Sequence, residues 1–249
     1  DSALRPDYWE VMLSKALAVR VGCGLHGAAE TDCYRLVHGE GDNLPGLIID
    51  YYGGVCVMQA HSVGMFRAKK QITEGLKKVY GDDLKAVYDK SSGTAPFKAG
   101  LELVDGYMYK KEGFSDDEQV VLENGHKFIV NWTEGQKTGF FIDQRVNRDL
   151  VRQYSKGRKV LNTFCYTGGF SVAAMAGGAT EVVSIDLSER AVKLAEENVK
   201  LNFGADAPHK AIACNAVEYL KDIDSDYDLI ILDPPAFAKH HKVLGNALQ

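Results

Sequence analysis

The strongest constraint on the fold of this chain is a repeated order of strand and helix between residues 159 and 233. Four short apolar runs, KVLNTF, EVVSID, KAIACN and YDLIILD, alternate with segments of helical spacing that begin near Ser171, Ser188 and Ala216. Strands joined through helices run parallel, because each helix carries the chain back to the edge of the sheet where the previous strand began. The sequence therefore predicts an α/β fold with a doubly wound, Rossmann-like parallel sheet.

Polar or glycine residues end or follow each of these four runs. They are Gly168-Gly169, Asp186, Asn215 and Asp233. The carboxyl ends of parallel strands share one edge of the sheet, where ligands bind in doubly wound folds. Turn formers are also common at strand ends for purely structural reasons. We favour a ligand site, because four positions would converge on one crevice.

The glycine turn narrows the class of ligand. The segment CYTGGFS lacks the G-x-G-x-x-G spacing that seats a pyrophosphate, and the chain has no G-x-x-x-x-G-K-[ST] loop for a nucleoside triphosphate. An adenosine ligand without phosphates remains, and S-adenosylmethionine fits this description. Asp186, 18 residues after Gly168, is placed to accept from the ribose hydroxyls. Asn215 can hydrogen-bond near the adenine edge, and the glycine turn can carry the amino-acid end.

The preceding part of the chain predicts smaller elements. Residues 6–20 have the spacing of a helix that begins at a proline, and a helix is expected near 66–80. Gly53-Gly54 and Asn124-Gly125 each separate two strand-like runs, as in β-hairpins. We therefore expect a helical connector (1–30), a small α+β domain (31–118) and a ligand-binding domain (119–249).

A basic cluster lies just before the repeated strands. Arg145, Arg148 and Arg152 fall on one predicted helix face, and an apolar stripe of Val146, Leu150 and Tyr154 is expected to pack. Asp143 is expected to cap this helix and Gly157 to end it. The net charge of −5 argues against a protein that is basic all over. The cluster is either a solvated face or an RNA contact through Arg148 and Arg152.

Composition suggests a reduced, soluble protein. No run is long and apolar enough to span a membrane, and the first residues do not resemble a signal peptide, so a cytoplasmic location is expected. Five cysteines are scattered without metal-ligand spacing, and no metal site is predicted.

Four segments resemble a known family in order and spacing. They are EGQKTGFFIDQR, VLNTFCYTGGFSVAA, VSIDLSERAVKLAEENVKLN and DLIILDPPAFAK. Together they resemble the ribosomal RNA large-subunit methyltransferase I family, class I S-adenosylmethionine-dependent enzymes that form 5-methylcytosine. The segment YRLVHGEGDNLPGLIIDYYG is similar to the family's central domain. The resemblance runs from about Tyr8 through nearly the whole chain.

The resemblance implies roles for individual residues. Residues 137–145 would close over the cofactor, and Asn215 stands where the family usually has an acid. Asp233, Pro234, Pro235 and Phe237 would form the catalytic motif that faces the methyl group and the base, with Phe237 available for stacking. The implied cofactor-binding residues are Phe140, Gln144, Arg145, Thr163, Phe164, Tyr166, Thr167, Gly168, Gly169, Asp186, Leu187, Asn215 and Asp233.

Two departures from the family pattern lead to further expectations. The family's nucleophilic cysteine lies in a later T/S-C-S motif that this chain lacks, and its N-terminal RNA-binding domain is also absent. The chain is therefore expected to be an internal fragment that transfers no methyl group by itself. Its sheet is expected to end on the strand at 229–232. This strand would either pair with a second copy to form a homodimer or be covered by the final helix of the chain.

Three alternatives stay open at this point. A guanine methyltransferase with an Asp-Pro-Pro-x-Phe motif needs no cysteine, because an exocyclic amine or N7 attacks the methyl group directly. The chain could instead be a non-catalytic module that binds an adenosyl cofactor, or an oxidoreductase with a degenerate fingerprint.

Overall fold

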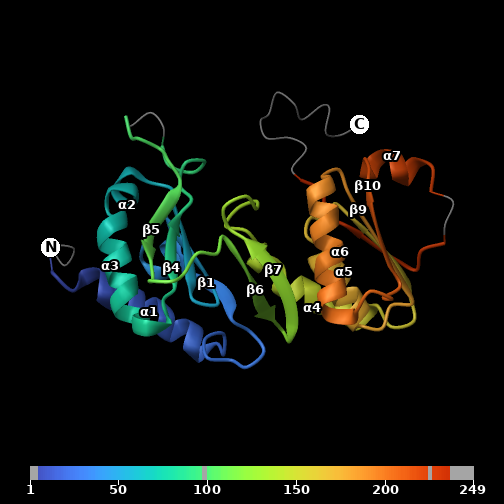
Figure 1. The fold of residues 1–249 in the computed structure, drawn as a ribbon, viewed down its shortest axis with the longest axis horizontal. Helices are drawn as coiled ribbons and strands as arrows, with labels where there is room; N and C mark the ends of the chain where they lie inside the picture. Colours follow the sequence, from blue (N-terminus) through green and yellow to red (C-terminus); the bar gives the residue numbers. More distant parts are fainter. Residues whose placement is uncertain (1–4, 97–99, 224–225, 236–249) are drawn as a thin grey trace. The chain divides into compact units, whose positions relative to one another are not determined.

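The computed structural model describes residues 5–96, 100–223 and 226–235. Within it the chain forms two compact units, 1–143 and 144–249, and each is described by itself (Figure 1). The division into domains at 1–30, 31–118 and 119–249 stays a prediction. No helix among the described residues has both the length and the apolar character needed to cross a membrane.

The first unit is built on a five-stranded sheet of order β1-β2-β3-β4-β5. Neighbouring strands are antiparallel except β3 and β4, which run parallel because helices α2 and α3 connect them. A single helix was predicted near 66–80, whereas two short helices meet at Ala68. The elements are β1 (Cys33–His38), β2 (Leu47–Tyr52), β3 (Val55–Ala60), α2 (Val63–Arg67), α3 (Lys69–Tyr80), β4 (Ala86–Asp89) and β5 (Gly106–Lys110).

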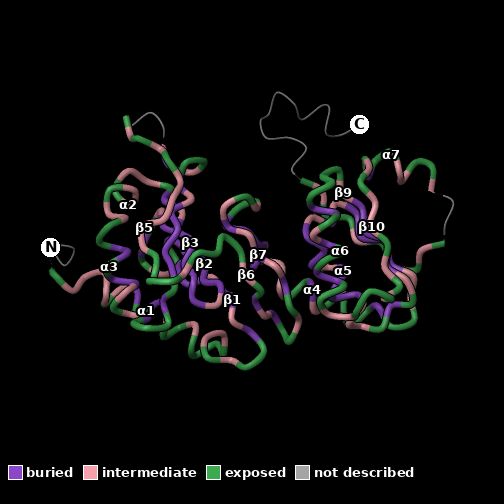
Figure 2. Tube along the Cα trace, viewed as in Figure 1, coloured by how far each residue is buried: buried purple, intermediate pink, exposed green. Residues whose placement is uncertain are grey.

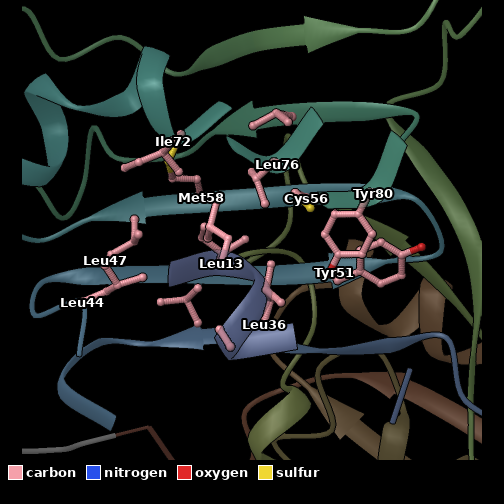
Figure 3. Packing of buried hydrophobic residues seen from close by; sticks show 14 of the residues in the cluster. Leu13, Leu36, Leu44, Leu47, Tyr51, Cys56, Met58, Ile72, Leu76 and Tyr80 are labelled. Carbon is pink, nitrogen blue, oxygen red and sulfur yellow. The ribbon is translucent and has the colours of Figure 1, made fainter. Parts of the chain in front are cut away.

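Helix α1 (Tyr8–Gly22) confirms the predicted N-terminal helix and packs on α3. The two helices approach closely at Gly75, where an added Cβ would lie 2.9 Å from Cδ1 of Leu13. Almost every residue of β2 and β3, the strands on which these helices pack, is buried (Figure 2). Figure 3 shows this core, in which the stacked rings of Tyr51 and Tyr80 have centroids 4.9 Å apart.

Both predicted hairpin turns are present. Gly53 and Gly54 have φ of 50° and 107° between β2 and β3, and Asn124 and Gly125 have φ of 50° and 78°. The second pair joins β6 (Glu118–Glu123) to β7 (His126–Asn131). Positive φ at both central positions matches the type I′ turns that glycine and asparagine favour.

The segment after β7 is fastened to the first unit by buried polar contacts. The Asp50 carboxylate, which is fully buried, accepts from Arg35 at 2.8 Å and from the Thr138 hydroxyl at 2.6 Å. The Lys90 ammonium donates to the carbonyl oxygen of Trp132 at 2.7 Å and to that of Gly135. Residues 132–138 are therefore positioned by the sheet of this unit.

The second unit confirms the predicted parallel sheet. The order is β10-β9-β8-β11 and every neighbouring pair is parallel. The strands are β8 (Lys159–Thr163), β9 (Glu181–Asp186), β10 (His209–Ala213) and β11 (Leu229–Leu232), and the helices are α4 (Arg145–Tyr154), α5 (Gly169–Ala176), α6 (Glu189–Phe203) and α7 (Ala216–Lys221).

Helix α4 differs from the prediction in which face it buries. Val146, Leu150 and Tyr154 are 71%, 44% and 60% exposed, whereas Arg148 is only 5% exposed. Val151 packs on the sheet instead, and the Arg148 side chain lies against Gly169. An arginine can bury its aliphatic stem in this way. The helical spacing of Arg145, Arg148 and Arg152 therefore did not show which face of α4 is exposed to solvent.

The ends of α4 also differ in part. The N-cap position is Gln144 and no side chain caps the helix, while Asp143 pairs with Lys137 at 3.3 Å. The predicted Asp143 cap was therefore wrong. Gly157 follows the helix in a turn with φ of 71°.

Helices α4 and α5 meet at a glycine. A Cβ added to Gly177 would lie 2.8 Å from the carbonyl carbon and 3.0 Å from the Cα of Arg152. Real side chains do not tolerate such distances to backbone atoms. Only glycine therefore permits this approach of the two helices.

A chain of buried and partly buried hydrogen bonds links α5 to three strands. Asn162 donates to Ser171 at 2.8 Å, the Ser171 and Ser184 hydroxyls are 2.6 Å apart, and the Ser184 hydroxyl lies 2.7 Å from Nε2 of His209. Burial lowers the pKa of His209 to about 4 from 6.5. The imidazole is therefore neutral in the folded protein at ordinary pH.

This burial predicts an acid-sensitive second unit. As the pH falls below 6.5, the unfolded chain binds a proton at His209 while the folded chain stays neutral to about pH 4. Stability should fall over this window by up to on the order of 3 kcal/mol, and His209 should contribute no pH dependence above it. Urea unfolding followed by far-ultraviolet circular dichroism would measure the loss.

The matched variant is His209→Gln, which keeps a polar side chain but does not titrate in this range. Its stability should depend less steeply on pH than that of the wild type. Tryptophan fluorescence provides an internal control, because both tryptophans, Trp9 and Trp132, lie in the first unit. Equal pH dependence of the two proteins by circular dichroism would contradict the prediction.

Candidate functional site

The loop after β8 and the end of β9 are joined by a direct contact. The backbone N–H of Tyr166 donates to Oδ2 of Asp186 at 2.9 Å, and that of Cys165 donates to the Ile185 carbonyl oxygen at 2.9 Å. The two predicted site segments are thus brought together at the carboxyl edge of the sheet. Asn215 and Asp233 follow β10 and β11, which flank β9 and β8 in the same sheet.

The backbone of the loop is strained. Phe164 and Tyr166 have φ of 54° and 47°, and Gly168 has φ of 77°. Only glycine adopts this region without a steric penalty, and each bulky residue there costs on the order of 1–2 kcal/mol. Such residues persist where the surrounding contacts hold them, and they concentrate at binding sites.

The Asp186 carboxylate accepts hydrogen bonds from the protein on both oxygens. Oδ1 accepts from the backbone N–H of Ser188 at 3.0 Å, and Oδ2 accepts from Tyr166. Each carboxylate oxygen has a second lone pair. The carboxylate is therefore fixed in orientation and can still accept from ligand hydroxyls.

An open hollow of about 370 Å³ lies beside this loop. This volume is at the lower end of the range for small-molecule sites. Leu187, which follows Asp186, is 76% exposed. The hollow is lined by Phe164, Val217, Leu220, Lys221, Leu232 and Pro234, so its walls are largely apolar.

Asn215 begins helix α7. Its Oδ1 accepts from the backbone N–H groups of Val217 at 2.9 Å and of Glu218 at 3.4 Å. Asn215 was expected to hydrogen-bond near the adenine edge. Because that oxygen already caps α7, the amide NH₂ is the less committed group.

The Asp-Pro-Pro motif follows β11 at the same edge. The Thr163 hydroxyl donates to the Ile231 carbonyl oxygen at 2.8 Å, which ties the end of β8 to β11. Gln144 lies 3.5 Å from Oδ2 of Asp233. Pro234 lines the hollow and Pro235 is exposed. The predicted catalytic Phe237 lies outside the described residues.

The remaining predicted residues lie in different places. Phe140 belongs to the first unit, where it is buried with its ring centroid 5.0 Å from that of Phe128. Arg145 is the first residue of α4 and is partly exposed. Thr167 and Gly169 are buried within the loop and at the start of α5.

No thiol of this site has the character of a nucleophile. Cys165 is 4% exposed, and burial, with the nearby Asp186 carboxylate, raises its pKa above the ordinary range. Burial also raises the pKa of the Cys214 thiol. A reactive cysteine needs the opposite shift. The described residues contain no group of three side chains placed to bind a metal ion.

Sequence reasoning missed the contribution of helix α6. The Asn198 side chain, which is fully buried, donates to the Thr167 carbonyl oxygen at 2.9 Å. An added Cβ on Gly168 would lie 2.8 Å from Cβ of Ala195. The available signal was a polar residue within the buried face of the segment RAVKLAEENVKLN.

Comparisons with known proteins agree with this geometry. Residues 110–249 match the family model of the S-adenosylmethionine-dependent methyltransferases. A ribosomal RNA large subunit methyltransferase from Deinococcus radiodurans is 40% identical over 247 residues, which cover 97% of this chain and 60% of the relative. A ribosomal RNA large subunit methyltransferase I from Erwinia tasmaniensis is 36% identical and covers 99% and 62%. The chain thus spans about 60% of the length of these relatives.

Solved structures show the same fold. A crystal structure of a candidate methyltransferase in complex with SAH has a TM-score of 0.81 and 29% identity, and the match covers 96% of this chain and 60% of that one. A candidate S-adenosylmethionine-dependent methyltransferase from Streptococcus mutans also has a TM-score of 0.81, with 28% identity over 97% of this chain and 63% of that one. The family model covers more than half of the chain, including the loop, Asp186 and the Asp-Pro-Pro motif. The chain therefore belongs to the family of S-adenosylmethionine-dependent methyltransferases.

Proposed function

We propose that the protein transfers a methyl group from S-adenosylmethionine to a base of large-subunit ribosomal RNA. The observation that carries this proposal is the strained loop at 164–168, bonded to the Asp186 carboxylate beside an apolar hollow. The names of the relatives support ribosomal RNA as the substrate.

The site offers one surface for each part of the cofactor, which supplies an electrophilic methyl group when bound. The loop backbone from Thr163 to Gly169 would hold the amino-acid end, and Asp186 would accept from the ribose hydroxyls. The hollow beside Phe164 would take the adenine ring, with Leu187 against one face. The amide NH₂ of Asn215 can donate to a ring nitrogen, since its oxygen caps α7. Arg145 and Gln144 at the start of α4, and Phe140, stay proposed contacts.

The proposed product is 5-methylcytosine. Methylation at carbon 5 requires a thiolate that adds to carbon 6 and makes carbon 5 nucleophilic. Cys165 and Cys214 do not meet this need, because burial raises the pKa of both thiols. We propose, as the family resemblance implies, that a cysteine outside these 249 residues supplies the thiolate. Asp233, Pro234 and Pro235, with Phe237, would face the base.

The raised pKa values of the Cys165 and Cys214 thiols favour a second candidate, a guanine methyltransferase. An exocyclic amine or N7 of guanine attacks the methyl group directly and needs no thiolate. Asp233 would then hold the amine through a hydrogen bond. The product nucleoside distinguishes the two candidates.

Association with a second copy stays a prediction. In the described sheet β11 is a terminal strand, with Ile230 and Leu232 48% and 61% exposed. A free strand edge can pair with another edge.

Replacing Asp186 with alanine should weaken cofactor binding. The change removes a charge-assisted acceptor for the ribose hydroxyls, and also the acceptor that fixes the Tyr166 amide. Loss of such a bond costs on the order of 1.5–3 kcal/mol, a tenfold to hundredfold rise in Kd. Calorimetric titration of the chain with S-adenosylhomocysteine would measure it.

The matched control is Asp206→Ala, which removes the same charge from an exposed position just before β10, at the amino edge of the sheet. Its Kd should equal that of the wild type. An unchanged Kd in Asp186→Ala would remove this carboxylate from the site. Absence of binding by the wild-type chain would contradict the proposed cofactor.

The product should identify the target base. Unmodified large-subunit ribosomal RNA would be incubated with labelled S-adenosylmethionine and either the 249-residue chain or the longest open reading frame that contains it. We expect 5-methylcytidine in digests from the longer protein and no methyl transfer by the chain alone, because its site has no competent thiol. Methylguanosine in either digest would favour the second candidate, and labelled RNA in neither would contradict methyl transfer to this substrate.

The basic helix α4 makes a narrower prediction than the sequence suggested. Arg148 is buried and is no longer expected to contact phosphate, whereas Arg152 is exposed and pairs with Asp149 at 2.7 Å. If Arg152 contacts RNA, Arg152→Ala should lower the slope of log affinity against log salt concentration by about 0.7–0.9. Filter binding with a large-subunit RNA fragment at several salt concentrations would measure this slope. Lys210→Ala on β10 is the control for loss of one positive charge. A slope in Arg152→Ala equal to that of the wild type would show that Arg152 does not contact RNA.

A further inference from the structure

We propose that helix α6 positions the cofactor loop, with Asn198 as the positioning residue and the contact of Gly168 with Ala195 as its second element. This inference rests on the proposed binding of S-adenosylmethionine. It adds a function for a helix that no predicted site residue occupies.

The loop needs external support. Its left-handed Phe164 and Tyr166 would relax toward negative φ if the surrounding contacts were lost. At the end of β9, the Ile185 carbonyl oxygen and the Asp186 carboxylate accept hydrogen bonds from the loop backbone. These contacts fix the first half of the loop.

Helix α6 supplies the contacts to the second half. The buried Asn198 amide donates to the Thr167 carbonyl oxygen, and Thr167 itself is 3% exposed. One turn earlier, Ala195 abuts Gly168 so closely that a Cβ there would meet both its Cα at 2.9 Å and its Cβ at 2.8 Å. The two contacts lie three residues apart, on one face of the helix. They hold consecutive residues of the loop.

A buried asparagine can also be a satisfied core residue without further function. The position of its partner argues for the positioning role. Thr167 lies directly before the glycine turn, which would carry the amino-acid end of the cofactor. The adenine hollow is instead lined by Phe164 and residues from α7 onward, and α6 contributes nothing to that lining. Loss of the α6 contacts should therefore affect the two ends of the cofactor unequally.

The test compares two ligands that share adenosine. S-adenosylhomocysteine has the amino-acid end, whereas 5′-methylthioadenosine lacks it. Asn198→Ala should raise the Kd of S-adenosylhomocysteine at least tenfold and leave that of methylthioadenosine within about threefold, an unequal loss expected from one hydrogen-bonded contact. Both are measured by calorimetry well below the melting temperature of the variant. Equal losses for the two ligands, or no loss, would overturn the inference.

The matched control is Asn202→Ala, one turn further along α6. Asn202 donates to the backbone carbonyl oxygen of Asn198 at 2.7 Å. Its ratio of the two Kd values should equal that of the wild type. A wild-type chain that binds neither ligand would contradict the proposed function, whereas a wild-type chain that binds both leaves the ratio in Asn198→Ala to decide the inference.

A second pair of variants tests the contact between Gly168 and Ala195 without changing Asn198. Gly168→Ala places a Cβ against Ala195 and should weaken S-adenosylhomocysteine selectively. Adding Ala195→Gly removes the collision with the Cβ of Ala195 and should restore a small part of the affinity. The contact with the Cα at 2.9 Å and the left-handed strain at position 168 stay in place. Equal losses for S-adenosylhomocysteine and methylthioadenosine in Gly168→Ala would show that the contact with α6 does not act on the amino-acid end. This pair decides the question if Asn198→Ala does not fold.

Discussion

The hydrogen bond from the Tyr166 amide to the Asp186 carboxylate connects the parts of the second unit that the proposed chemistry requires. It joins the loop after β8 to the end of β9, and it engages the side chain proposed to bind the ribose. A loop with two bulky left-handed residues would not keep this shape without such partners. Asp186 therefore has a structural role before any ligand arrives, and the Ser188 amide fixes the orientation of its carboxylate.

In the first unit, polar side chains also hold a segment that has no regular secondary structure. The fully buried Asp50 holds Thr138, and Lys90 holds the carbonyl groups of Trp132 and Gly135. These contacts fasten the segment that resembles the cofactor-closing part of the methyltransferase I family. In both units a segment without regular secondary structure is held by a buried polar side chain, Asp50 of β2 in the first unit and Asn198 of α6 in the second. Such contacts are costly to break, because the partner is left buried and unsatisfied.

The sequence predicted the order of elements well, because that order depends on local patterns. Alternating apolar runs gave the parallel strands, and two positive-φ dipeptides, at Gly53 and Asn124, gave the hairpins. The buried face of a helix and the residue that caps it were harder to predict. The choice of Val146 over Val151 as the packing residue depends on where α4 crosses the sheet, and the Asp143 carboxylate was taken by Lys137 instead of capping a helix.

The site was predicted to a similar extent. Asp186 and the glycine turn follow strands and can be identified from their position, whereas Asn198 contacts a residue 31 positions away. No local pattern encodes that pairing. The same holds for the burial of Arg148, which depends on the approach of α5.

The glycine contact between α4 and α5 determines which positions are free to vary. Because Gly177 lies against the backbone of Arg152, the separation of the two helices is set by main-chain atoms and not by the side chains of α4. The exposed positions 146, 150 and 154 can then change in sequence without moving Gln144 or the buried Arg148. Related chains should diverge freely along that face of α4 while position 177 stays glycine.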